Sequence, residues 1–141
     1  MSRPAQPPPD WFGKPNPFAI KASRDDGEIG ARSRTELEQL VRVYEAMLAE
    51  GVSRDHVAGI LAVLRWVLGE RVPAPASGCL PAGVRPDAAE MDREDQAIEP
   101  LVRQWRATGR SRAYWAGAEH ALLWVRGQVH DRPLLDRATP G

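Results

Sequence analysis

Apolar residues recur at intervals of three and four in two early stretches of the chain, which predicts two consecutive helices. The first helix is expected over residues 34–50, where one face carries Leu37, Leu40, Val41, Tyr44, Met47 and Leu48. Ser33 and Glu36 have the spacing of a capping box that starts this helix. Gly51 can supply the left-handed residue that ends it.

The second helix, expected over residues 54–68, is apolar around most of its circumference. Its main face holds Val57, Ile60, Leu61, Leu64, Val67 and Leu68, and a neighbouring stripe holds Gly59, Ala62, Val63 and Trp66. A helix with so little polar surface must be buried on two sides. Ser53 is expected to cap its start and Gly69 to end it. The short turn makes the two helices an antiparallel hairpin.

This second helix returns later in the chain in altered form. Residues 115–127 match residues 57–69 without a gap, with identities at Ala58/Ala116, Gly59/Gly117, Leu64/Leu122, Trp66/Trp124, Val67/Val125 and Gly69/Gly127. The match predicts an internal duplication, with a fourth helix over residues 112–126. Glycine costs about 1 kcal/mol relative to alanine inside a helix, so its recurrence indicates a place where another helix comes close.

A third helix is expected after Asp87, which together with Glu90 can cap a helix start. Residues 87–99 contain six carboxylates and one arginine, as expected of a solvated first turn or two. Pro100 leaves two alternatives, a fresh helix that begins there or one continuous, kinked helix.

The predicted fold is therefore all-α, with two tandem αα-hairpins packed as a small four-helix arrangement around a pseudo-twofold axis. The hairpins cover residues 33–70 and 87–127, and a Pro/Gly linker over residues 71–86 joins them. We expect the helices at 54–68 and 112–126 to form the centre. Residues 1–32 are expected to be a Pro-rich disordered tail, and residues 128–141 a C-terminal tail that frays at its end.

An aromatic segment interrupts the N-terminal tail. Trp11, Phe12, Phe18 and Ile20 fall within residues 11–20, although disordered sequence is normally poor in aromatic residues. Two interpretations follow: the segment lies across a groove of its own domain, or it docks on a partner and orders there.

The composition argues against some classes of function but does not identify one. The chain has 141 residues, enough for one domain, and its 19 basic residues balance its 19 acidic ones, which favours neither nucleic acid nor membrane surface as a ligand. Cys79 is the single cysteine, so no internal disulfide and no cysteine-based zinc site is expected. Neither a signal peptide nor a membrane span is recognisable, and we expect a cytoplasmic protein without membrane contact.

Residues 51–61 resemble the turn and early recognition helix of a helix-turn-helix DNA-binding domain. Gly51 stands at the turn glycine and Val57 at the apolar position six residues on. The resemblance implies that Arg54, Asp55 and His56 face bases.

Arginines gather near the start of the fourth helix. Arg103, Arg106, Arg110 and Arg112 lie within ten residues, an arrangement that can contact phosphate. The alternative is a solvated turn that the acidic run at 87–99 compensates.

Catalysis is not expected. His56, His120 and His130 are scattered, and no zinc-binding His-Glu-x-x-His, phosphate-binding loop or nucleophile elbow occurs. Neither a metal nor a cofactor is predicted.

The leading hypothesis is a non-enzymatic module that binds another protein, or itself as a homodimer, in the manner of a small accessory or regulatory protein of a bacterial phage or plasmid. Its partner-binding residues are the exposed Trp/Gly/Ala stripe of the second and fourth helices and the aromatic segment: Gly59, Trp66, Trp115, Gly117, Trp124, Trp11, Phe12 and Phe18. Tryptophan is enriched at interface hot spots. The alternative is a DNA-binding regulator that uses residues 51–61, through Arg54 and His56, or the turn 103–112, through Arg106, Arg110 and Arg112.

Overall fold

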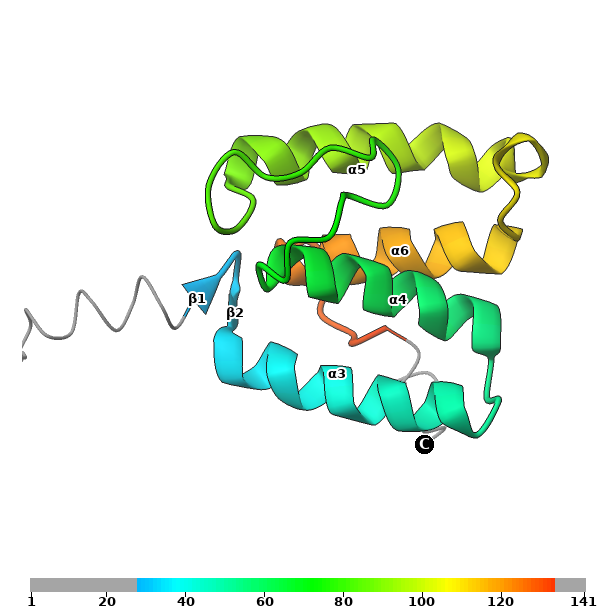
Figure 1. Cartoon of the computed structure of the whole chain (residues 1–141), viewed down its shortest axis with the longest axis horizontal. Helices are drawn as coiled ribbons and strands as arrows, with labels where there is room; N and C mark the ends of the chain where they lie inside the picture. The colour runs from blue at the N-terminus through cyan, green and yellow to red at the C-terminus, as the bar shows by residue number, and fades with distance from the viewer. Residues whose placement is uncertain (1–27, 134–141) are drawn as a thin grey trace, which may run out of the picture.

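A computed structural model describes residues 28–133, which form a mostly helical fold (Figure 1). The helices are α3 (Arg34–Ala49), α4 (Arg54–Val67), α5 (Ala88–Arg103) and α6 (Arg112–Val125), with a short 3-10 helix η1 (Trp105–Thr108) before α6 and two antiparallel strands, β1 (Glu28–Ile29) and β2 (Arg32–Ser33), before α3. The all-α class is confirmed, apart from this two-stranded sheet. Trp11, Phe12 and Phe18 lie outside the described residues.

The ends of α3 and α4 agree with the predicted boundaries to within one residue. The Ser33 hydroxyl accepts a hydrogen bond from the Glu36 amide at 3.1 Å, as expected of an N-cap. Gly51 adopts the left-handed conformation with φ of 78°. The capping role predicted for Ser53 is wrong, because this residue is itself left-handed, with φ of 45°, and its side chain makes no capping hydrogen bond.

Helix α5 begins with a complete capping box. The Asp87 carboxylate accepts from the Glu90 amide at 2.8 Å, and the Glu90 carboxylate accepts from the Asp87 amide at 2.9 Å. Pro100 lies inside the helix, near its C-terminal end, and does not start a new one. The Gln104 amide still donates to the Pro100 carbonyl at 2.9 Å, so the helical pattern continues past the proline.

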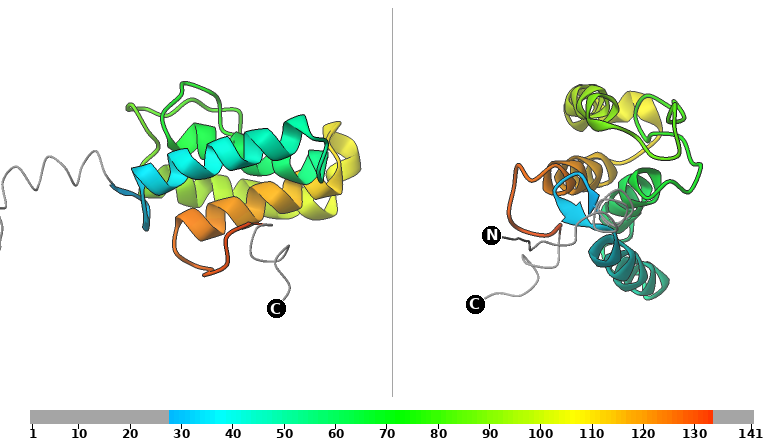
Figure 2. Two further views of the ribbon diagram at one scale, coloured as in Figure 1. Left: turned by 90° about the horizontal axis from the view of Figure 1, so that it is seen from below. Right: turned by 90° about the vertical axis from the view of Figure 1, so that its left-hand side faces the viewer.

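Helices α4 and α6 form the centre of the molecule, as predicted. Figures 1 and 2 show them side by side and running in the same direction, with α3 against α4 and α5 against α6. Their inward faces supply most of the fully buried side chains, including Ile60, Leu64, Val67, Leu122 and Val125.

The two recurring glycines lie where α4 and α6 cross. A Cβ atom added to Gly59 would lie 2.0 Å from the Tyr114 carbonyl oxygen, and one added to Gly117 would lie 2.3 Å from the His56 carbonyl oxygen. The two contacts are reciprocal, since residues 56 and 59 precede 114 and 117 by the same interval. The backbones therefore approach as closely as side-chain-free residues allow.

The folded part of the chain extends into both predicted tails. Residues 28–32 belong to the strand hairpin, whose Ala31 amide donates to the Val125 carbonyl at 2.8 Å. The Arg32 guanidinium donates to the carbonyls of Trp124 and Val129 at 2.8 and 3.0 Å. The Tyr44 hydroxyl donates to the Pro133 carbonyl. Hydrogen bonds from side chains of the folded part to backbone carbonyls therefore hold the chain as far as residue 133.

Candidate functional site

The tryptophans predicted to form an exposed stripe are inside the molecule. Trp66, Trp115 and Trp124 are 2%, 4% and 1% exposed, and Gly59 and Gly117 are buried at the helix crossing. The prediction that these five residues present a partner-binding surface is therefore wrong for the described residues.

Each buried tryptophan is covered by residues from elsewhere in the chain, which the periodicity of its own helix cannot predict. The Trp115 indole donates to the Thr108 hydroxyl at 2.9 Å, beneath η1. The Arg32 guanidinium lies 4.4 Å from the ring centroid of Trp124. Trp66 borders a hollow whose other walls come from the linker and α5, and its indole nitrogen is buried without a hydrogen-bond partner.

The linker is held in place by a buried carboxylate. Glu94 of α5 is 1% exposed and accepts hydrogen bonds from the amides of Ala76 and Ser77. A buried carboxylate is costly unless hydrogen bonds satisfy it, and these two backbone donors do so. The acidic run predicted to be solvated therefore contains a residue that fixes residues 71–86 over α4.

The arginines predicted to contact phosphate gather at one end of the molecule. The turns at 50–53 and 104–111 lie at the same end of the molecule, because α4 and α6 both begin there (Figure 1). A shallow hollow of about 420 Å³ between the two helix starts is lined by Ser53, Arg54, Asp55, His56 and Ala113. The fold thus brings the two separately predicted DNA-binding elements to the same end of the molecule, which we call the basic end: Arg54, His56, Arg106, Arg110 and Arg112. Arg110 lines a different hollow there, between Tyr114, Arg65 and the linker.

Two of these arginines stack on aromatic rings. The Arg106 guanidinium carbon lies 4.6 Å from the Trp105 ring centroid, and that of Arg110 lies 4.5 Å from the ring centroid of Tyr114. Burial raises the pKa of Tyr114, while the neighbouring Arg110 charge lowers it. Stacking orients a guanidinium plane and leaves its edge donors free for a ligand.

The expected compensation by the acidic run at 87–99 does not extend to the arginines of the basic end, where Asp55 is the acidic neighbour of Arg54 in the hollow. Arg103 lies 3.8 Å from Glu99, whereas among residues 28–133 no ion pair involves Arg54, Arg106, Arg110 or Arg112. All four are exposed. Between residues 103 and 113 the sequence contains no acidic residue.

Helix α4 offers no recognition helix of the expected kind. Beyond its first turn, most of its residues are buried, from Val57 to Val67, because α3, α6 and the linker cover them. Its first two residues, Arg54 and Asp55, are exposed, and His56 is half-buried. Of the residues 51–61 that resemble a helix-turn-helix element, only the first turn of the helix, with Arg54 and Asp55, is therefore exposed to a ligand, and base contact by Arg54, Asp55 and His56 stays a prediction.

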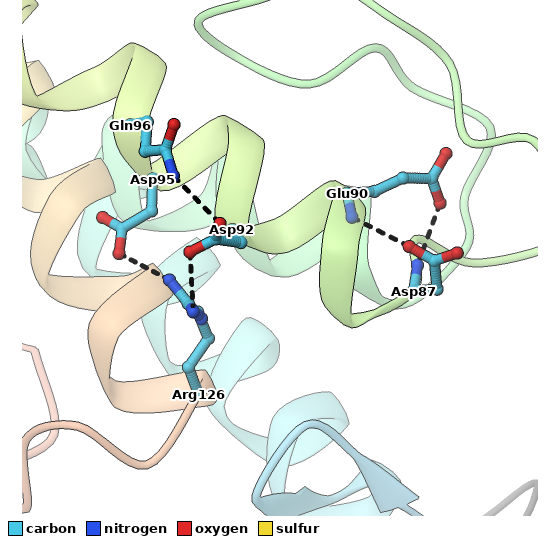
Figure 3. A network of polar contacts seen from close by, with 6 residues as sticks. All are labelled: Asp87, Glu90, Asp92, Asp95, Gln96 and Arg126. Carbon is cyan, nitrogen blue, oxygen red and sulfur yellow. Dashed lines mark hydrogen bonds and ion pairs between the residues drawn. The ribbon is translucent and has the colours of Figure 1, made fainter.

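A second charged network joins α5 to α6 (Figure 3). The Arg126 guanidinium contacts Asp92 at 3.1 Å and Asp95 at 2.7 Å, and its side chain is 19% exposed. Burial raises the pKa of Asp95, although Arg126 acts in the opposite direction. Glu119 lies nearby, and burial followed by the charges of Asp95 and Glu99 raises its pKa. The network stabilises the α5/α6 contact. Its arginine is paired with two aspartates of the same network.

The described residues hold no further arrangement with obvious chemistry. No group of three histidine, cysteine, aspartate or glutamate side chains that could hold a metal ion occurs within residues 28–133. The His120 ring forms a hydrogen bond of 2.8 Å with the Asp131 carbonyl. In that same range, every helix is too short or too polar to cross a bilayer.

Comparison with known protein-family models, with curated proteins and with solved structures finds no match.

Proposed function

We propose that this protein is a non-enzymatic binding module that contacts the phosphate backbone of nucleic acid through its basic end. The observation that supports the proposal is that Arg54 and the arginines of the 104–112 turn lie at the same end of the molecule, exposed and without an ion pair to any residue between 28 and 133. Arginine presents a planar set of donors that matches phosphate oxygens.

The expected binding is independent of base sequence. Base reading needs a helix or strand whose side chains enter a groove, and α4 is covered by its neighbours. Phosphate contacts release condensed counterions, so affinity should fall steeply with salt, with a slope of about −0.9 per phosphate contacted. Four arginines therefore imply a slope of about −3 to −4 in a plot of log K against log salt.

The test is fluorescence anisotropy of the full chain with a fluorescein-labelled duplex of mixed sequence, at salt concentrations of about 50 to 200 mM. The variant Arg110→Ala/Arg112→Ala should reduce the salt slope by about 2. The matched control, Arg42→Ala/Arg93→Ala, removes two exposed arginines from α3 and α5, and it should leave the slope unchanged.

Two results would overturn the proposal. One is the absence of an anisotropy change at the lowest salt concentration. The other is an equal loss of affinity in the variant and in the control, which would mean that net charge alone drives the binding. The same number of phosphate contacts on a single strand should give a slope of about −0.7 per contact, against about −0.9 on a duplex, so a single-strand slope about three-quarters of the duplex slope would support contact with the backbone.

Protein binding stays a prediction, but the buried tryptophans cannot form the binding surface.

We also propose that the two helical hairpins arose by duplication, which the reciprocal glycine contacts support. Duplication relates Arg54 to Arg112 at the interval of 58 residues that relates Gly59 to Gly117, so these two arginines of the basic end would occupy equivalent positions of the two halves. A regulatory role, a phage or plasmid origin and a cytoplasmic location also remain predictions.

A further inference from the structure

We propose that the aromatic segment at residues 11–20 docks on the apolar surface around Leu80 and Val84, at the end of the molecule opposite the basic end. This surface belongs to the linker between α4 and α5. The occupant is a segment of the same chain, and the interaction is independent of the nucleic-acid proposal.

The docking surface is the most exposed apolar part of the described chain. Leu80 and Val84 are 63% and 81% exposed. They border a hollow of about 420 Å³, whose remaining walls are Gly69, Arg71, Pro81, Ala82 and Gly83. A second hollow, of about 210 Å³, lies on the other side of Leu80 and Pro81 and reaches the buried ring of Trp66. Two neighbouring hollows that share Leu80 and Pro81 suit an extended chain with bulky side chains.

The aromatic segment has the matching chemistry. It supplies Trp11, Phe12, Phe18 and Ile20, each of which gains free energy when it leaves water. Pro15 and Pro17 each have a fixed φ, so this segment has less conformational entropy to lose on docking.

The start of the described chain puts the segment within reach. Glu28 begins β1, and the strand hairpin packs on the C-terminal end of α6, beside the C-terminal end of α4 (Figures 1 and 2). Gly69, which follows α4, lines the larger hollow. The seven residues from 21 to 27 span about 25 Å when extended, more than the roughly 21 Å length of α4. This length of chain puts Ile20 within reach of the linker surface beside the strand hairpin.

The single cysteine gives a direct test, because Cys79 is exposed and adjoins Leu80. A nitroxide attached to Cys79 in the full-length, ¹⁵N-labelled chain should broaden the amide signals of residues 11–20 more than those of residues 1–6. Leu80→Asp/Val84→Asp should abolish this difference. The matched control Val43→Asp/Val52→Asp, at apolar residues 42% and 43% exposed elsewhere, should preserve it.

A reciprocal measurement needs no label. In the full chain, Trp11→Ala/Phe18→Ala should shift the methyl signals of Leu80 and Val84 and leave that of Val43 in place. Uniformly weak broadening of residues 1–20 would overturn the proposal. Broadening that requires mixing nitroxide-labelled and ¹⁵N-labelled chains would also overturn it, because the occupant would then be a second copy.

Discussion

Replacing Gly59 by alanine is expected to destabilise the protein, although alanine is the better helix former. The new Cβ would lie 2.0 Å from the Tyr114 carbonyl oxygen and 3.1 Å from the Ala118 amide nitrogen. Nonbonded atoms prefer separations of about 3.5 Å, so α4 and α6 would have to move apart by about 1 Å or more. Both obstacles are backbone atoms of a packed helix, which cannot rotate away as a side-chain end can.

The size of the effect follows from two opposing terms. Alanine gains about 1 kcal/mol over glycine in helix propensity. Overpacking a tight interior costs about 1–3 kcal/mol, and a cost at the upper end or above is expected here because the two central helices must separate along their contact. The net loss is about 2 kcal/mol, which lowers Tm by roughly 8–16 °C in a domain of this size.

Thermal and urea unfolding followed by far-UV circular dichroism measures this loss. Gly83→Ala is the control, because the nearest atom to its Cβ would be the Arg85 carbonyl oxygen at 3.9 Å. That variant should change stability by about 0.5 kcal/mol or less. A Gly59→Ala protein that unfolds at or above the wild-type temperature would refute the argument. Because Gly117 faces the same crossing, the double variant should lose less than the sum of the two single losses.

Two further changes test the charged groups inside the fold. Glu94→Gln replaces one acceptor oxygen with a donor that faces the amides of Ala76 and Ser77. It should lower the free energy of unfolding by about 1–3 kcal/mol and accelerate hydrogen exchange at both amides. Unchanged exchange would contradict the conclusion that Glu94 holds the linker in place. The raised pKa of Glu119 means that this carboxyl contributes stability below its unfolded pKa and loses it as pH rises through the folded value. Glu119→Gln should therefore raise the urea midpoint at pH 7, and the gain should vanish below about pH 4; an equal gain at both pH values would show that ionisation is not the cause.

Local sequence signals were enough to predict the helices and their central pair. Each predicted boundary rested on a residue with a defined backbone role, such as Gly51 in the left-handed region or Asp87 in a capping box. The recurrence of glycine at 59 and 117 predicted close approach because a helix interior has no other use for glycine. That prediction is confirmed by the crossing of α4 and α6.

The surface was harder to predict than the helices, because what covers a side chain depends on distant segments. The stripe containing Trp66 was correctly predicted to be apolar. Part of what covers it is the linker, which has no helical period in its sequence and is held in place by Glu94. The buried role of Glu94 has no sequence signal, since its partners are backbone amides. Conversely, the two arginine-bearing elements were found separately, and only the parallel course of α4 and α6 brings Arg54 to the same end as Arg112.

The strand hairpin has a consequence for folding during synthesis. Its Ala31 amide and Arg32 side chain bind carbonyls at the end of α6, more than 90 residues later in the chain. On the ribosome, the first elements to emerge must therefore wait for the last helix before their hydrogen bonds can form. The central α4/α6 contact is delayed in the same way, so the tertiary fold should complete only after α6 has left the ribosome.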